Sequence, residues 1–183
     1  MAYDVAVLVG SLRKGSFSRA VAENLATLAG DKLALRIVEI GDLPLYNPDL
    51  DGDAPPAAWA RFRGEVISAD AALFVTPEYN RSIPGLLKNA LDVGSRPYGH
   101  SVWKGKPAAI VSVSPGLLGA FGANHHLRQP LVFLDMPVMQ QPEAYISKVG
   151  DLLDGDGKLT NEDTRSFLSG FLAAFATWIG KHK

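Results

Sequence analysis

The fold is decided by the stretch Val5-Ala-Val-Leu-Val9-Gly10-Ser11-Leu12-Arg13-Lys14-Gly15-Ser16-Phe17-Ser18-Arg19. Its apolar, β-branched start predicts a buried strand, and apolar residues then recur at helical spacing at Ala20, Val21, Leu25 and Leu28. A strand that enters a helix through a loop of glycines, hydroxyls and basic residues leaves backbone N–H groups unpaired at the positive end of the helix dipole. Such a loop, here residues 10–18 (the first loop), is a site for a phosphate.

The composition of the first loop indicates which phosphate it suits. The dinucleotide fingerprint G-x-G-x-x-G is absent because position 12 is Leu. The nucleoside-triphosphate loop G-x-x-x-x-G-K-[ST] matches only at its two glycines, since Ser16 stands in place of its lysine. Side-chain donors come from Ser11, Arg13, Ser16 and Ser18. This set suits a monophosphate; the alternative is an ordinary strand-to-helix turn capped by a serine.

Length, charge and cysteine content exclude several classes of protein. The chain has 183 residues, which suits one α/β domain over residues 1–183. Its net charge of −1 offers no electrostatic footprint for nucleic acid or for an anionic membrane. It has no cysteine, which excludes thiolate nucleophiles and disulfides and fits the cytoplasm. No apolar run approaches the roughly 20 residues that span a bilayer. We therefore expect a cytoplasmic protein with no nucleic-acid or membrane partner.

Further strands and helices alternate along the chain. Strands are predicted at Leu33–Ile40, Ala71–Val75, Ala108–Val113 and Pro137–Met139. Helical spacing follows at residues 56–69, 84–93, 119–134 and 167–179, and Pro130 should kink or split the third of these. Five strands alternating with helices predict an α/β fold with a parallel, doubly wound sheet.

Two more loops are expected beside the first loop. In such a sheet, ligands bind beyond the carboxyl ends of the strands, where residues 77–83 (the second loop) and 114–119 (the third loop) should meet residues 10–18. All three are rich in glycine, proline or hydroxyls. A phosphate site beside two loops that can grip a flat heterocycle fits flavin mononucleotide (FMN). We assign Glu78 and Tyr79 to positioning, because hydride transfer to a flavin needs no protein acid in its first step. No catalytic side chain is predicted.

Other chemistries lack their motifs. The G-x-S-x-G elbow does not occur around Ser114. His125 and His126 are adjacent, so on a helix they point apart and cannot chelate one metal. The run that begins at Asp154 starts like a calcium loop but carries Arg165 where the last ligand should be. We predict no metal site.

Several motifs resemble those of a known family. They are Gly10–Ser18, Thr76-Pro-Glu-Tyr-Asn80, Ser82-Ile-Pro-Gly85 and Leu127-Arg-Gln129. Together they resemble the NAD(P)H-dependent FMN reductase family, and within it the bacterial quinone and chromate reductases. The resemblance covers essentially the whole chain. It implies one flavodoxin-like, FMN-binding domain with a five-stranded parallel sheet in the order 2-1-3-4-5.

The resemblance also implies which residues bind FMN. In the family the first loop holds the phosphate, which here gives Ser11, Leu12, Arg13, Lys14, Gly15, Ser16, Phe17 and Ser18. The second loop contacts the isoalloxazine ring, which gives Pro77, Glu78, Tyr79, Asn80 and Arg81, and the third loop adds Ser114 and Gly116. The chain departs from the family pattern at Ser18, commonly Asn, at Gly119-Ala120, usually Gly-Gly, and at Pro130 within a helix.

The activity implied is electron transfer from NADPH or NADH through FMN to a quinone. Chromate (an oxyanion), azo compounds and free flavins are further acceptors that the resemblance suggests. It also implies a homodimer or homotetramer with active sites at subunit interfaces, where we expect Arg81 to pair with Glu143. One alternative is a non-catalytic electron carrier of the same fold, although such carriers are usually strongly acidic. Another is a flavin-free scaffold.

Overall fold

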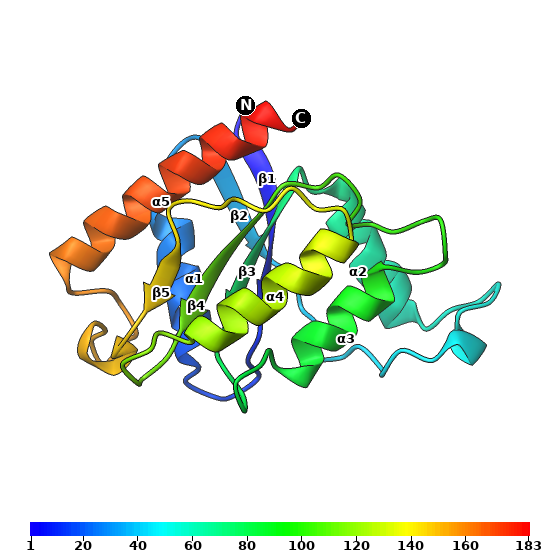
Figure 1. Cartoon of the computed structure of the whole chain (residues 1–183), viewed down its shortest axis with the longest axis horizontal. Helices are drawn as coiled ribbons and strands as arrows, with labels where there is room; N and C mark the ends of the chain where they lie inside the picture. Colours follow the sequence, from blue (N-terminus) through cyan, green and yellow to red (C-terminus); the bar gives the residue numbers. More distant parts are fainter.

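The computed structural model describes all residues, 1–183, and contains one five-stranded parallel sheet (Figure 1). Its strands are β1 (Tyr3–Val9), β2 (Leu33–Ile37), β3 (Ala71–Thr76), β4 (Ala108–Val113) and β5 (Ala144–Ile146). Their order across the sheet is β2-β1-β3-β4-β5, and every neighbouring pair is parallel. The predicted fold class and strand order are therefore confirmed.

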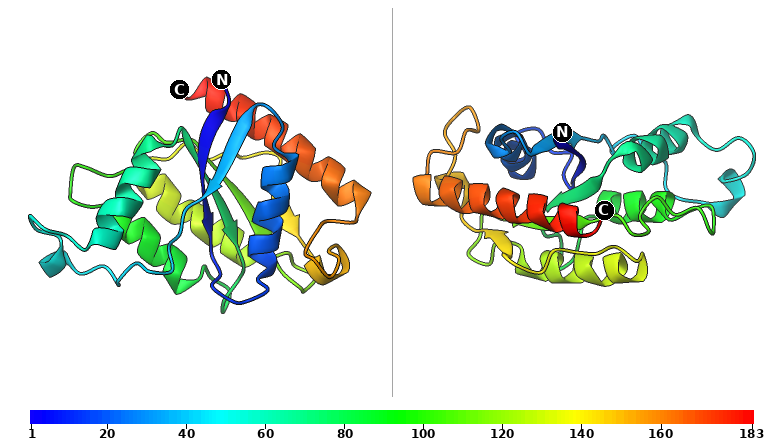
Figure 2. Two further views of the ribbon diagram at one scale, coloured as in Figure 1. Left: turned by 180° about the vertical axis from the view of Figure 1, so that it is seen from behind. Right: turned by 90° about the horizontal axis from the view of Figure 1, so that it is seen from above.

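Helices cover both sides of the sheet (Figure 2). The helices are α1 (Phe17–Leu28), α2 (Ala57–Ser68), α3 (Gly85–Gly94), α4 (Phe121–Phe133) and α5 (Glu162–Lys181), with short 3₁₀ turns η1 (Pro48–Leu50) and η2 (Val149–Asp151). Side chains of α1 and α5 pack on one face, and those of α2, α3 and α4 pack on the other. None of the helices has both the length and the apolar character that crossing a bilayer requires.

Successive side chains of each strand point to opposite faces of the sheet and so contribute to two separate hydrophobic cores. In β1, Val5, Val7 and Val9 join the core with α1 and α5, whereas Ala6 and Leu8 join the opposite core. The central strands β3 and β4 are buried at every position, as their continuous apolar sequence predicts. The aromatic residues Phe171 and Phe175 of α5 pack in the core that this helix shares with α1.

The fifth strand was predicted in the wrong place. Residues 137–139 form only an isolated bridge, in which Met139 donates its N–H to the carbonyl of Ala108 at 2.8 Å. The strand proper is β5, which pairs with the carboxyl half of β4. Pro137 and Pro142 have no N–H to donate to a ladder, so regular pairing begins only after the second proline.

Other boundaries also differ from the prediction. Helix α4 is not split at Pro130: it runs unbroken to Phe133, and the N–H of Leu134 donates to the Pro130 carbonyl at 2.9 Å. Pro130 lies in the last turn, so it removes a single helical hydrogen bond, and the burial of Leu131 holds that turn on the sheet. Strand β2 ends at Ile37, and Pro84 is the N-cap of α3 rather than its first residue.

A long arm, residues 41–56, extends from the end of β2 to α2 and carries η1 near its tip (Figure 1). A buried ion pair anchors it: both Nη atoms of Arg63 lie 2.8 Å from the two Asp51 carboxylate oxygens. The Asp51 side chain is 4% exposed, and Arg63 Nε also donates to the Val93 carbonyl at 2.9 Å. The arm is thereby fastened to α2 and to the end of α3.

Replacing Asp51 with Ala should lower the free energy of unfolding by about 3 kcal/mol, because Arg63 would keep a buried charge without its partner. Urea denaturation followed by tryptophan fluorescence measures the change. Asp53→Ala, on the same arm but exposed and unpaired, is the control and should stay within about 0.5 kcal/mol of the wild type. Equal effects of the two substitutions would contradict a structural role for the buried pair.

Candidate functional site

The three loops identified from the sequence begin at one edge of the sheet. In the ladder Val9 pairs with Val75, and Thr76 pairs with Ser112, so β1, β3 and β4 end at nearly the same level. This edge lies at the bottom of Figure 1, where α1 starts, while both chain termini lie at the top. The first, second and third loops are therefore neighbours in space.

Gly10 allows the first and second loops to touch. Its N–H donates to the Val75 carbonyl at 2.8 Å, which continues the ladder by one residue. A Cβ on Gly10 would lie 3.0 Å from Cδ of Pro77, closer than nearly all real Cβ contacts. A glycine is needed here because the start of the second loop crosses directly over the first.

The start of α1 presents a row of free backbone donors. Ser16 is the N-cap, and its hydroxyl accepts the N–H of Arg19 at 3.2 Å. Gly15 has φ of +65°, a left-handed conformation that turns the chain into the helix. The backbone N–H groups of residues 14–18 have no partner within the chain. Five N–H groups at the positive end of a helix dipole form a cradle for an anion.

The side chains of the first loop differ in their position. Ser18 is 2% exposed, and its hydroxyl makes no hydrogen bond within the chain. Arg13 folds back: Nη2 donates to the Gly15 carbonyl at 2.8 Å, and its guanidinium lies 5.2 Å from the centre of the Phe17 ring. Arg13 therefore braces the loop and keeps further donors exposed. Lys14 is exposed on the outer side of the loop.

A surface hollow of about 490 Å³ lies along the outer side of the first loop. Its walls are residues 13–17 and the start of α1 on one side, and Gly150 and residues 153–157 on the other. No residue of the second or third loop lines it. The hollow thus flanks the row of donors without reaching the loops expected to contact a ring.

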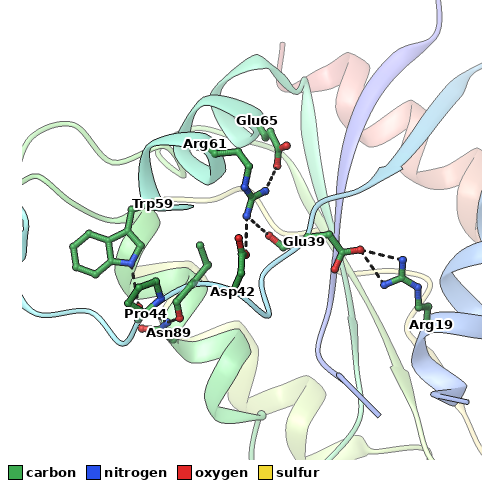
Figure 3. A network of polar contacts seen from close by, with 9 residues as sticks. Arg19, Glu39, Asp42, Pro44, Trp59, Arg61, Glu65 and Asn89 are labelled. Carbon is green, nitrogen blue, oxygen red and sulfur yellow. Dashed lines mark hydrogen bonds and ion pairs between the residues drawn. The ribbon is translucent and has the colours of Figure 1, made fainter. Parts of the chain in front are cut away.

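Figure 3 shows a polar network that joins α1 to the segment after β2. Both Nη atoms of Arg19 lie 3.0 Å from one Glu39 oxygen, and this contact raises the pKa of Arg19. Arg61 on α2 donates to the Glu39 carbonyl at 2.9 Å and to Asp42 at 2.9 Å. Each of these contacts is solvent-exposed and contributes at most about 1 kcal/mol. Together they fix residues 39–42 against the first turn of α1 and against α2.

The same segment is fixed further along by one side chain from α2 and one from α3. Trp59 Nε1 donates to the Pro44 carbonyl at 3.0 Å, and Asn89 Nδ2 donates to it at 3.0 Å (Figure 3). Gly41 then lies so close to the first loop that a Cβ there would be 2.6 Å from Cδ2 of Leu12. The segment after β2 therefore supports the loop from outside.

The second loop contains a tight hairpin turn. Tyr79 and Ser82 exchange two backbone hydrogen bonds of 2.9 Å each, and Asn80 and Arg81 between them have φ of +50° and +65°. Two positive φ values at the centre identify a type I′ turn. The Tyr79 side chain is half exposed, while the Glu78 carboxylate accepts the N–H of Ala123 at 3.0 Å.

The third loop is held by β5 and the residues after it. The Ser114 hydroxyl accepts the N–H of Gly116 at 2.9 Å, and the Gly116 carbonyl accepts the N–H of Lys148 at 3.0 Å. Gly119 has φ of +56°, and a Cβ there would lie 2.8 Å from Cβ of Tyr145. The loop is thus a fixed turn whose first residues lie beside the second loop.

The adjacent histidines of α4 make different contacts. His125 Nε2 lies 3.0 Å from the Tyr145 hydroxyl, and burial together with Glu143 raises the pKa of Tyr145 to about 12. His126 Nδ1 lies 2.8 Å from the Ser82 hydroxyl. On the second loop, Arg81 Nη1 lies 3.3 Å from Glu78 Oε1, three residues earlier in the same chain. A contact of Arg81 with Glu143 between subunits stays a prediction.

Sequence reasoning missed four residues that shape the site. Glu39 and Gly41 support the first loop, and Gly122 and His126 contact the second. Their partners are tens of residues away in the chain, so no local spacing could reveal the pairing. The one available signal was composition: a glycine in the first turn of a predicted helix often marks a close approach.

Comparison with known proteins places this geometry among flavoenzymes. A family model described as NADPH-dependent FMN reductase matches residues 3–151. A quinone reductase of Pseudomonas putida is 64% identical over 177 residues, 97% of this chain and 95% of that protein. A 2-hydroxy-1,4-benzoquinone reductase of Burkholderia sp is 48% identical, with 98% and 97% covered. The solved structure of FerB, a flavoenzyme NAD(P)H:(acceptor) oxidoreductase from Paracoccus denitrificans, superposes with a TM-score of 0.93 at 46% identity, covering 99% of both chains.

Gly41→Ala should lower the free energy of unfolding by about 1 kcal/mol, because the added methyl group displaces the Leu12 side chain. Leu12→Ala in the same chain should restore most of that loss, since it removes the clashing atoms. Gly52→Ala, which meets no atom within 4 Å, is the matched control. Urea denaturation of the four proteins tests the contact, and a loss that Leu12→Ala does not relieve would contradict it.

Proposed function

The chain belongs to the NADPH-dependent FMN reductase family, and on that premise we propose that it transfers electrons from NAD(P)H through bound FMN to quinones. The observation that carries the proposal is the row of free N–H groups of residues 14–18 at the start of α1. A dianionic phosphate is the ligand that such a row suits.

The residues present fit FMN in both of its parts. The free N–H groups, together with the hydroxyls of Ser16 and Ser18, match a phosphate that offers only acceptor atoms. The half-exposed Tyr79 and the turn that follows offer a surface and backbone groups to a flat ring. Ser114 and Gly116 lie on the neighbouring third loop, which can contact the same ring.

The protein's part in the reaction is binding and orientation. When bound, FMN would supply the two-electron chemistry between NAD(P)H and a quinone. The Glu78 carboxylate is already engaged by the N–H of Ala123 and by Arg81, which supports a site without a protein acid or base. The proposed phosphate contacts of the first loop would fix the cofactor, and the second loop would orient the ring for both substrates.

We propose a chemical class, the quinones, for the electron acceptor. The names of the relatives in Pseudomonas putida and Burkholderia support a quinone. They also favour a reductase over the alternative of a non-catalytic electron carrier. Chromate, azo compounds and free flavins are further acceptors that we propose, because a ring bound at an open edge of the sheet can pass electrons to any acceptor that reaches it. We propose that either NADPH or NADH can serve as the electron donor.

Assembly into a homodimer or homotetramer is part of the proposal. Several large apolar side chains of α4 and the third loop are exposed, namely Leu117, Leu118, Phe121, Val132 and Phe133. Phe133 is 88% exposed, and scattered single residues of this kind are common on monomers. Five exposed apolar side chains on one helix and the loop before it support a contact with another subunit.

The decisive assay measures NADPH and NADH oxidation by the purified yellow protein with benzoquinone, chromate, an azo dye or free flavin as acceptor. We expect quinone-dependent oxidation without any added reductase. A protein that binds FMN but oxidises neither nucleotide with any acceptor would be the carrier instead.

Ser18→Ala should weaken FMN binding by roughly 10- to 100-fold, because it removes a hydroxyl that donates to a charged phosphate. Stability of the flavin-free protein should be unchanged, since this hydroxyl has no partner within the chain. Ser169→Ala, exposed on α5, is the matched control. Fluorescence of released FMN measures the affinity, and equal affinity of the Ser18→Ala and control proteins would contradict the proposed phosphate contact.

A further inference from the structure

The first turn of α4 is capped by a residue from another loop. The helix's own N-cap, Ala120, has φ of +59° and no side chain that can accept a hydrogen bond. Instead Glu78 Oε2 accepts the N–H of Ala123 at 3.0 Å, from 45 residues away in the chain. A carboxylate at this position also complements the positive end of the helix dipole.

Gly122 leaves room for that carboxylate. A Cβ on Gly122 would lie 2.9 Å from Glu78 Oε2 and 3.4 Å from the carbonyl oxygen of Arg81. The helix therefore approaches the second loop more closely than any other residue type would allow without displacing Glu78.

A second contact joins the same two elements. His126, one turn along α4 from Gly122, places Nδ1 2.8 Å from the Ser82 hydroxyl. Glu78 precedes the hairpin turn and Ser82 closes it. Both ends of the turn Tyr79–Ser82 are thus tied to one helix.

The turn has reason to need this support. Arg81 has a positive φ, which costs roughly 1 kcal/mol or more for a residue with a Cβ, whereas Asn80 before it tolerates this conformation. Helix α4 is a firm anchor, since Leu127 and Leu131 are fully buried and Asn124 Nδ2 donates to the buried Ser112 hydroxyl at 3.3 Å.

We propose that Glu78 and His126 are positioning residues that clamp the flavin-ring turn, Tyr79–Ser82, onto the first two turns of α4. The inference rests on the proposed function, which makes the second loop the contact for the isoalloxazine ring. In this account the Glu78 side chain acts on the helix, and the ring meets the turn that Glu78 and His126 hold in place.

The His126 contact is tested by a double-mutant cycle on the flavin-loaded protein. His126→Ala and Ser82→Ala should each weaken FMN binding about fivefold, and the double variant should be no worse than either, because all three lack the same hydrogen bond. His126→Gln, which keeps a hydrogen-bonding terminus, should recover part of the loss. Dissociation constants come from FMN fluorescence on dilution, and the visible spectrum and midpoint potential report the surroundings of the ring.

The neighbouring His125→Ala is the matched control. His125 is on the same helix but contacts Tyr145, so its loss should leave the spectrum and the FMN affinity unchanged. Multiplicative losses of about 25-fold in the double variant, unchanged affinity in the single variants, or an equal effect of His125→Ala would each overturn the clamp.

The Glu78 contact is tested by comparing two substitutions. Glu78→Gln keeps a carbonyl that can accept the N–H of Ala123, so it should recover most of the FMN affinity that Glu78→Ala loses. Glu78→Ala removes the cap and should weaken FMN binding about fivefold or more. If Glu78→Gln abolished turnover while leaving FMN affinity intact, Glu78 would be an acid or base and the positioning role would be wrong.

The outcomes separate this inference from the function on which it rests. A wild-type protein that binds flavin and reduces quinones, with variants that behave like it, overturns only the clamp. A wild-type protein that binds no flavin overturns both.

Discussion

The unpaired N–H groups at the start of α1 are the constraint on which the rest of the site depends. Each helix leaves its first N–H groups without helical partners, and a protein normally satisfies them with side chains or water. Here only the N–H of Arg19 is capped, by Ser16, and those of residues 14–18 stay free. Strand β1, buried on both faces, fixes where the helix begins. The chain thus holds a fixed set of donors at the edge of its sheet.

Three close approaches place the surrounding segments against this cradle and against one another. Gly10 lets Pro77 cross over the first loop, Gly41 lets the segment after β2 reach Leu12, and Gly122 lets α4 reach Glu78. In each case the missing side chain allows two segments that are distant in sequence to touch. The atom approached belongs to the ring of Pro77, to the side chain of Leu12 and to the carboxylate of Glu78, so each glycine makes room for one side chain of the neighbouring segment. The site is therefore assembled from loops that each rest on a neighbouring element.

Much of the site could be predicted from the sequence because its signals are local. The β-branched run before Gly10, the hydroxyls of the first loop and the helical spacing after Ser18 lie within one stretch, and they correctly gave β1, the loop and α1. The fold class followed from the alternation of strands and helices. Strand β5 was misplaced because it has only three residues, and the run Pro137-Val-Met139 looked more like a strand. The links from α4 to the second loop span 44 and 45 residues, and no local pattern encodes them.

The central claim is that the N-terminus of α1 binds the phosphate of FMN. The most direct test compares the dissociation constants of FMN and riboflavin for the wild-type protein, because the two ligands share the ring and differ only by the phosphate. Several charge-assisted hydrogen bonds to the phosphate should make FMN bind at least about 100-fold more tightly, with the difference shrinking as added inorganic phosphate competes. Equal affinity for the two flavins would show that the phosphate is not held there and would contradict the account.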